Sequence, residues 1–244
     1  KTDTIGGIEP TGSLCIDGLG ATYVAATFTG ELIFNETNLL SDGPSGIAVA
    51  RYSEFGWDWA LTAGGLGEDR IWDCDGRSSS GVEIVGEFSG NASFGSLYTG
   101  QSNGTDLFVA EVSQSGGWVD IVTGGGDGID RATGIVHNKQ GSTFVTGVTS
   151  AGLTLGQDTL TDIDGFSDEN HYDIFLAELL ENNTWEWAIS AGGDGYDEAV
   201  ALEVAEDGSP LLSYIFNGDF STGPYNATSL GSFDIGVWLY QTDR

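Results

Sequence analysis

Short apolar runs alternate with polar turns along the whole chain, and no window keeps the 3.6-residue period of an amphipathic helix. The runs are rich in Val, Ile, Leu, Phe and Trp, as in "GIAVARYS" (46–53), "DLFVAEVS" (106–113) and "DIFLAELL" (173–180). Gly, Asp, Asn and Ser fill the gaps between them, and these residues favour tight turns. The pattern predicts an all-β protein.

The apolar runs belong to an internal repeat. Each repeat is marked by a Gly-Gly pair, and Trp57, Trp118 and Trp185 each lie seven residues before the first Gly of a pair. Two apolar runs precede each of the Gly-Gly pairs at Gly64, Gly125 and Gly192, and two more follow it, so a repeat holds four strands. The repeats cover about 6–63, 64–124, 125–191 and 192–244 plus 1–5, and the pairs are Gly6-Gly7, Gly64-Gly65, Gly125-Gly126 and Gly192-Gly193.

A four-stranded unit repeated radially is a blade of a β-propeller. The last repeat lacks its fourth strand, whereas "KTDTIGG" (1–7) supplies a fourth strand with no other strands before it. The count from Gly192 through the C-terminus to Gly6 is 58 residues, which equals the spacing of the first two pairs. We therefore predict one propeller domain, residues 1–244, with four blades of four antiparallel strands. Thr2–Ile5 would close the ring beside Phe233–Tyr240 and cover its free edge.

The stretch "GGGDGIDRATGIVHNKQGSTFVTGVTS" (124–150) resembles the SBBP-type β-propeller repeat of secreted bacterial and archaeal proteins. The shared pattern is Gly-Gly-x-Gly-x-Asp, a strand, a turn and a Phe-Val-Thr-Gly strand. The resemblance extends over all four repeats and is closest in the third. It implies a propeller architecture and an extracellular or cell-surface location, and it implies little about chemistry.

The chain is strongly acidic, with 37 Asp and Glu against 7 Lys and Arg and a formal net charge of −30. Nucleic acid and anionic membrane surfaces are excluded as partners because both need clustered basic residues. No apolar segment is long enough to insert in a membrane. The acidity has two interpretations: it keeps the protein soluble, or it reflects a salty medium or bound divalent cations.

Five Asn-x-Ser/Thr sequons favour a secreted or surface glycoprotein. They begin at Asn35, Asn91, Asn103, Asn182 and Asn226.

Asp69, Asp130 and Asp197 each lie four residues after the second Gly of a pair, and Glu9 is the nearest match in the first repeat. In a propeller these loops surround one mouth of the central channel, where converging carboxylates would bind a hard cation such as Ca²⁺. The alternative is that each Asp accepts backbone N–H hydrogen bonds in its own turn.

The longest insertion, residues 156–173, places Asp162, Asp164 and Asp168 around Gly165. Alternating acidic residues around a Gly suit a Ca²⁺ loop, although the EF-hand pattern is absent. A solvated acidic loop is the other interpretation. Ca²⁺ is the one cofactor that the sequence suggests.

Cys15 and Cys74 fall in the first strands of the first two repeats, one residue out of phase with each other. Successive side chains of a strand point to opposite faces, so the two cysteines lie on facing surfaces of neighbouring blades. This arrangement favours a disulfide between blades in a secreted protein, with two buried thiols as the alternative.

No motif for nucleophilic catalysis or phosphate binding occurs, and the recurring Trp residues are best explained by packing. We therefore predict a non-catalytic extracellular surface module for binding, adhesion or assembly, assisted by Ca²⁺, with a protein or glycan partner. The alternatives are a glycan-acting enzyme with paired carboxylates, or a filament or surface-lattice subunit that exchanges its N-terminal strand. The long, variable connections between second and third strands are expected to carry recognition.

Overall fold

The computed structural model describes residues 8–34, 37–77, 81–161, 163 and 171–241. Every regular element in this part of the chain is a β-strand, so the all-β prediction is confirmed. No helix in the described ranges is long and apolar enough to cross a membrane. The chain divides into two compact units, residues 1–123 and 124–244, and each is described by itself.

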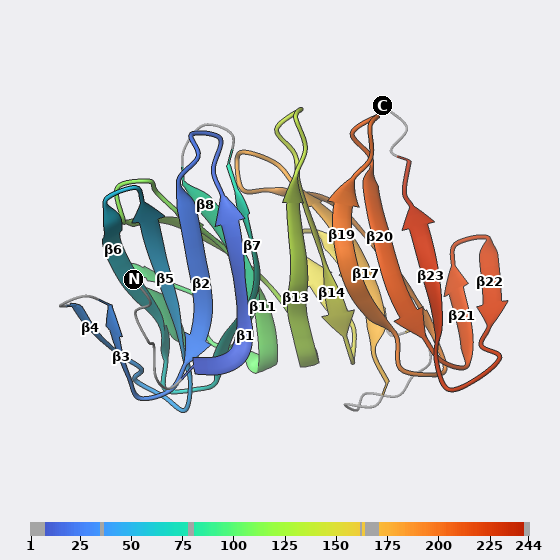
Figure 1. The fold of residues 1–244 in the computed structure, drawn as a ribbon. Coiled ribbons are helices and arrows are strands. Elements are labelled where there is room, and N and C mark those ends of the chain that lie inside the picture. Colours follow the sequence, from blue (N-terminus) through green and yellow to red (C-terminus); the bar gives the residue numbers. More distant parts are fainter. Residues whose placement is uncertain (1–7, 35–36, 78–80, 162, 164–170, 242–244) are drawn as a thin grey trace. The chain divides into compact units, whose positions relative to one another are not determined.

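The first unit holds two sets of four paired strands, which match the four apolar runs of each of the first two repeats (Figure 1, blue to green). In one sheet, β1 (Ile8–Ile16), β2 (Thr22–Phe28), β5 (Gly46–Ser53) and β6 (Gly56–Gly65) pair antiparallel in that order. In the other, β7 (Asp69–Gly76), β8 (Val82–Ser89), β11 (Asn103–Val112) and β12 (Trp118–Gly124) pair in the same order.

The second unit repeats this plan with one strand fewer. Its first sheet consists of β13 (Asp127–His137), β14 (Thr143–Thr149), β17 (Asp173–Leu179) and β18 (Trp185–Gly193). Its second sheet consists of β19 (Glu198–Val204), β20 (Pro210–Phe216) and β23 (Asp234–Leu239). Among the described residues no fourth strand pairs with β23. Residues 1–7, which were expected to supply it, lie outside the described residues.

Each repeat also contains a short hairpin in the connection between its second and third strands, where a long loop was expected. The hairpins lie between the second and third strands, and their strands are two to four residues long. Such short strands carry too few residues for a recognisable alternation of apolar and polar positions. They are β3 (Glu31–Phe34) with β4 (Thr37–Leu40), β9 (Ala92–Phe94) with β10 (Leu97–Tyr98), β15 (Leu153–Leu155) with β16 (Asp158–Leu160), and β21 (Asp219–Thr222) with β22 (Tyr225–Thr228).

The hairpins dock on the Gly-Gly pairs. β9 pairs with Gly64 and Gly65 at the end of β6, and β21 pairs with Gly192 and Gly193 at the end of β18. In the second unit Gly125 also forms a bridge to Thr154 of β15. The Gly-Gly pair that begins a repeat therefore marks the place where the hairpin of that repeat docks.

The core of each unit lies between its sheets. In the first unit it includes the fully buried Tyr23, Ile47, Ile71, Ile84 and Phe108. In the second unit Leu212, Tyr214 and Phe216 of β20 pack in one cluster with Ile174 and Leu176 of β17. The predicted packing of neighbouring sheets face to face thus holds within each unit.

A disulfide joins the two sheets of the first unit. Cys15 of β1 and Cys74 of β7 are bonded, with their Cα atoms 6.0 Å apart. Both side chains are buried.

Candidate functional site

The antiparallel topology gives each sheet two different ends. Turns between first and second strands and between third and fourth strands lie at one end. The Gly-Gly loops and the hairpin connections lie at the other, which we call the hairpin end (Figure 1). Among the described residues, Asp69, Asp130 and Asp197 and the sequon residues Asn91, Asn103 and Asn226 belong to the hairpin end.

Asp69 lies buried at the hairpin end of the first unit, where β7 begins. Its Oδ2 accepts a hydrogen bond of 2.6 Å from Gly65 N, and its own backbone N donates to Ser45 Oγ at 3.0 Å. Burial raises the pKa of the Asp69 carboxyl to about 7, although the bond from Gly65 favours the charged form. Asp69 therefore accepts a backbone N–H hydrogen bond within its own turn, which is one of the two roles that the sequence allows for it.

The glycines of the motif are explained by the same contacts. A Cβ on Gly64 would lie 2.8 Å from Asp69 Oδ2. A Cβ on Gly65 would overlap the carbonyl oxygen of Asn91, and one on Gly67 would overlap that of Ser89. In the Gly-Gly-x-Gly-x-Asp loop, the Asp carboxylate lies against Gly64, and backbone carbonyl oxygens lie against Gly65 and Gly67. These positions therefore leave no room for a side chain.

Asp130 and Asp197 occupy the same position as Asp69 in the second unit, and both are fully buried. A Cβ on Gly192 would lie 3.0 Å from Asp197 Oδ2. In the part of the chain that the structure describes, no group of three or more His, Cys, Asp or Glu side chains is arranged to hold a metal ion. A cation role for Asp69, Asp130 and Asp197 stays a prediction.

The acidic insertion is described only at its flanks. Asp162, Asp164 and Asp168 lie outside the described residues. Beside them, Ile163 N donates a hydrogen bond of 2.8 Å to Oδ2 of Asp173, a buried carboxylate at the start of β17. The Ca²⁺ role of this loop also stays a prediction.

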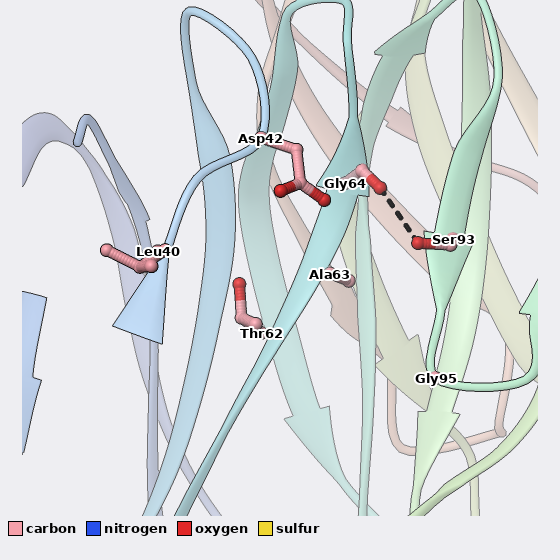
Figure 2. A pocket seen from close by; sticks show the side chains of 7 residues that line it. All are labelled: Leu40, Asp42, Thr62, Ala63, Gly64, Ser93 and Gly95. Carbon is pink, nitrogen blue, oxygen red and sulfur yellow. Dashed lines mark hydrogen bonds between the residues drawn. The ribbon is translucent and has the colours of Figure 1, made fainter. Parts of the chain in front are cut away.

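A cavity of about 220 Å³ opens at the hairpin end of the first unit (Figure 2). Thr62 and Gly64 of β6 form one wall, and Ser93 of β9 faces them, its hydroxyl donating to Gly64 O at 3.1 Å. Asp42 is the one charged side chain in the lining, which also includes Leu40, Ala63 and Gly95. A single carboxylate does not provide the acid and nucleophile pair that glycoside hydrolysis needs.

The recurring Trp residues cover the tips of the hairpins. The Trp118 indole lies against Gly95 at the tip of the β9–β10 hairpin and donates from Nε1 to Thr62 O at 3.3 Å. Its ring also meets Phe94 edge to face, with the centroids 4.9 Å apart. Trp57 meets Phe34 in the same way, and Trp185 lies against Gly156. These contacts give the repeated Trp a packing role.

The last sheet presents an apolar face, and no strand in the described part of the chain pairs with the outer side of β23. Ile235, Val237 and Leu239 alternate along β23, and their side chains are 72%, 69% and 43% exposed. Trp238 and Tyr240, on the opposite face, pack against the core of the second unit. In the first unit, Leu14 and Ile16 of β1 are similarly exposed on the face opposite Cys15. Exposed apolar rows of this kind mark surfaces that bind something.

The sequon asparagines Asn91, Asn103, Asn182 and Asn226 are all exposed, as glycosylation requires, and Asn35 lies outside the described residues.

No protein-family model matches the chain, and a comparison with curated proteins finds no match either. The likeness to SBBP-type repeats therefore rests on the motif and on the repeat spacing.

Proposed function

We propose that this chain is a non-catalytic extracellular module for binding, adhesion or assembly, built as a four-bladed β-propeller. The carrying observation is the last sheet, in which no strand among the described residues pairs with the outer side of β23 and an apolar row on β23 is exposed. In the other three sheets the third strand has a fourth strand beside it. An edge of this kind takes up a further strand, either from the same chain or from another.

The pairing register of the completed sheets supports residues 1–5 as the missing strand. Ile47 of β5 pairs with Ala63, the residue before a Gly-Gly pair, and Ile174 of β17 likewise pairs with Ala191. Ile235 is the matching residue of β23, and Ile5 precedes Gly6-Gly7. The proposed closure therefore places Ile5 opposite Ile235 and Lys1 opposite Leu239.

The disulfide and the exposed sequons support an extracellular location. Cys15–Cys74 is a structural bridge between two sheets, and such bridges persist in oxidising compartments. The variable connections at the hairpin end, with Ca²⁺ bound by the 162–168 loop, would contact a protein or glycan partner.

The closure is tested by cysteine cross-linking. The double variant Ile5→Cys/Ile235→Cys is expected to form a disulfide within one chain, found by peptide mapping under non-reducing conditions. Ile5→Cys/Ser232→Cys serves as the control, because Ser232 precedes β23 and lies out of register. No enrichment of the Ile5–Ile235 bridge over the control would overturn the closure.

A second candidate is a filament or lattice subunit, which the same edge of β23 favours. In that arrangement the N-terminal strand of one copy pairs with β23 of the next. The cross-link would then join two chains, and light scattering would show a mass that grows with concentration.

The non-catalytic assignment is tested on a panel of polysaccharides. Retention of the protein without the release of new reducing ends is the expected result for a binding module. Release of reducing ends would instead favour the glycan-acting alternative.

A further inference from the structure

Two hairpin tips in the described structure are capped by an indole. Gly95 and Gly156 both stand at a tip with φ of +62°, and a Cβ on either would lie within 3.3 Å of a Trp side chain. The Trp comes from the fourth strand of the same repeat: Trp118 of β12 covers Gly95, and Trp185 of β18 covers Gly156. The tip and the indole are therefore a repeating pair.

The tip of the last hairpin has the same backbone and no indole over it. Gly223 has φ of +59°, and no described atom lies within 4 Å of the position of its Cβ. A groove of about 490 Å³ opens there instead. Its walls are Ala188–Ser190 of β18, Tyr225 of β22, and Trp238 and Tyr240 at the end of β23.

The comparable junction in the first unit shows what fills this space. The segments "WDWALTAGG" (57–65) and "WEWAISAGG" (185–193) align without a gap, so Ser190 stands where Thr62 stands. Trp118 occupies the first junction and donates to Thr62 O, and a cavity of about 220 Å³ remains beside it (Figure 2). The larger groove beside Ser190 lies at the equivalent junction of the second unit, where no described indole takes the place of Trp118.

We propose that this groove is a binding site for an aromatic side chain of a partner protein, and for an indole in particular. The proposal deepens the proposed binding function and rests on it. The indole ring would lie over Gly223, and its N–H would donate to the carbonyl oxygen of Ser190, as Trp118 donates to Thr62. Apolar cavities of about 150 Å³ already bind benzene, so the volume is sufficient for an indole.

The lining favours a neutral aromatic ligand. It contains no charged side chain, and it includes the three aromatic rings of Tyr225, Trp238 and Tyr240. Contacts between aromatic rings strengthen binding beyond the burial of apolar area alone. The net charge of −30 disfavours acidic residues beside the aromatic side chain of the partner.

The site does not compete with closure of the ring. Trp57 pairs with Tyr52 of β5, and Tyr240 is the residue of the last repeat that matches Tyr52. In the register proposed above, residues 1–5 extend as far as Leu239 and stop before Tyr240. Pairing in that register therefore does not require residues 1–5 to cover Tyr240.

The test uses the full chain and N-acetyltryptophanamide as the probe, with N-acetylleucinamide as the apolar control. Titration followed by two-dimensional NMR is expected to shift the amides of Ser190 and Gly223, and the Leu compound to bind at least about 3-fold more weakly. Tyr225→Ala should weaken binding about 3–10-fold by removing one aromatic wall. Ala188→Phe should abolish binding by filling the groove.

Matched variants in the first unit distinguish specific binding in the groove from non-specific binding of the aromatic probe. Tyr98→Ala removes an exposed Tyr of the β9–β10 hairpin and should leave binding unchanged. Trp118→Ala should create a second site over Gly95 and raise the stoichiometry from one to two. If that variant does not fold, the two groove variants still decide the question.

Equal binding of the Trp and Leu compounds, no binding to the wild-type chain, or binding unaffected by Ala188→Phe would overturn the indole site. None of these results bears on the Ile5–Ile235 cross-link, so a failure of the site is distinguishable from a failure of the proposed closure.

Discussion

At the scale of single residues, two buried carboxylates cap turns of the first unit with opposite electrostatic outcomes. Asp17 caps the β1–β2 turn: Oδ1 accepts from Leu19 N and Ala21 N, and Oδ2 accepts from the Tyr23 hydroxyl at 2.8 Å. Burial raises the pKa of Asp17, but these three donors outweigh burial and lower the pKa below its usual value. For Asp69, burial outweighs the hydrogen bond from Gly65 N, and the pKa of its carboxyl rises to about 7.

Asp69→Asn is expected to make the unfolding free energy less sensitive to pH. A carboxyl whose pKa is about 7 when folded and about 3.8 when unfolded binds its proton more tightly in the folded state. The wild type therefore loses stability as pH rises from about 4 to 7, by on the order of 2–4 kcal/mol. Asn keeps an acceptor for Gly65 N and does not ionise. Urea unfolding at pH 4–8 should show the variant gaining on the wild type, whereas Asp42→Asn, at an exposed carboxylate, should not gain.

Asp17→Asn should show the opposite dependence. The lowered pKa of Asp17 means that its ionised form stabilises the fold above the unfolded pKa, and that this contribution is lost as pH falls through the folded pKa. The variant should be less stable than the wild type by roughly 1.5–3 kcal/mol at pH 7, because hydrogen bonds to a charged acceptor are lost. The difference should shrink in acid. A constant difference across the same urea series would show that ionisation of Asp17 does not contribute.

At the scale of elements, the main strands of the described repeats could be predicted and the hairpins could not. β14 (TFVTGVT) and β17 (DIFLAEL) are buried along their whole length and are rich in β-branched and large apolar residues, so they stand out from the polar turns around them. β10 has two residues, and its place is set by the docking of β9 on Gly64 and Gly65. That contact joins residues far apart in the sequence, so no local sequence pattern predicts it. The phase argument for the cysteines succeeded because it needed only the alternation of a strand.

Gly65→Ala is expected to destabilise the first unit by about 2–4 kcal/mol. The added methyl group would overlap the carbonyl oxygen of Asn91, so the β9–β10 hairpin must shift away from β6. Gly231→Ala is the control, since an added Cβ there meets nothing within 4 Å of described structure. Chemical denaturation of both variants measures the cost. Equal stability of the two would show that hairpin docking does not need a glycine.

Removing the disulfide should lower stability by about 2–4 kcal/mol. Cys15 and Cys74 are 59 residues apart in sequence, so the bridge constrains a long loop in the unfolded chain. Cys15→Ser/Cys74→Ser, compared with the wild type under oxidising and reducing conditions, isolates the effect. The reductant should destabilise the wild type and leave the double variant unchanged. A wild type insensitive to reductant in the unfolding transition would contradict the expected role.

At the scale of the whole molecule, the sequence predicts four repeats but leaves two roles open for the recurring aspartates that follow the Gly-Gly pairs. The three aspartates that follow the Gly-Gly pairs were expected at a mouth of the channel or in their turns, and each is buried. Their spacing is identical for a ligand and for a cap, because both need a carboxylate near a glycine loop. The burial of these carboxylates depends on how the hairpin of the same repeat docks on the Gly-Gly pair, a contact between residues far apart in the sequence.

The acidity of the chain predicts that its stability depends on salt. With a net charge of −30, the carboxylates repel one another most strongly in the folded state at low ionic strength. NaCl shortens the range of this repulsion from about 30 Å at 0.01 M to about 3 Å at 1 M, so Tm should rise along such a series.

Added Ca²⁺, compared with NaCl at the same ionic strength, should raise Tm further if the 162–168 loop binds it. A ligand that binds only the folded state stabilises that state by mass action. Mg²⁺, which demands a tighter octahedral site, should give a smaller rise. The triple variant Asp162→Ala/Asp164→Ala/Asp168→Ala should lose the extra effect of Ca²⁺ and keep that of NaCl. A Tm that does not change across the whole series would contradict both parts of the prediction, and an unchanged Ca²⁺ response in the triple variant would move the cation away from this loop.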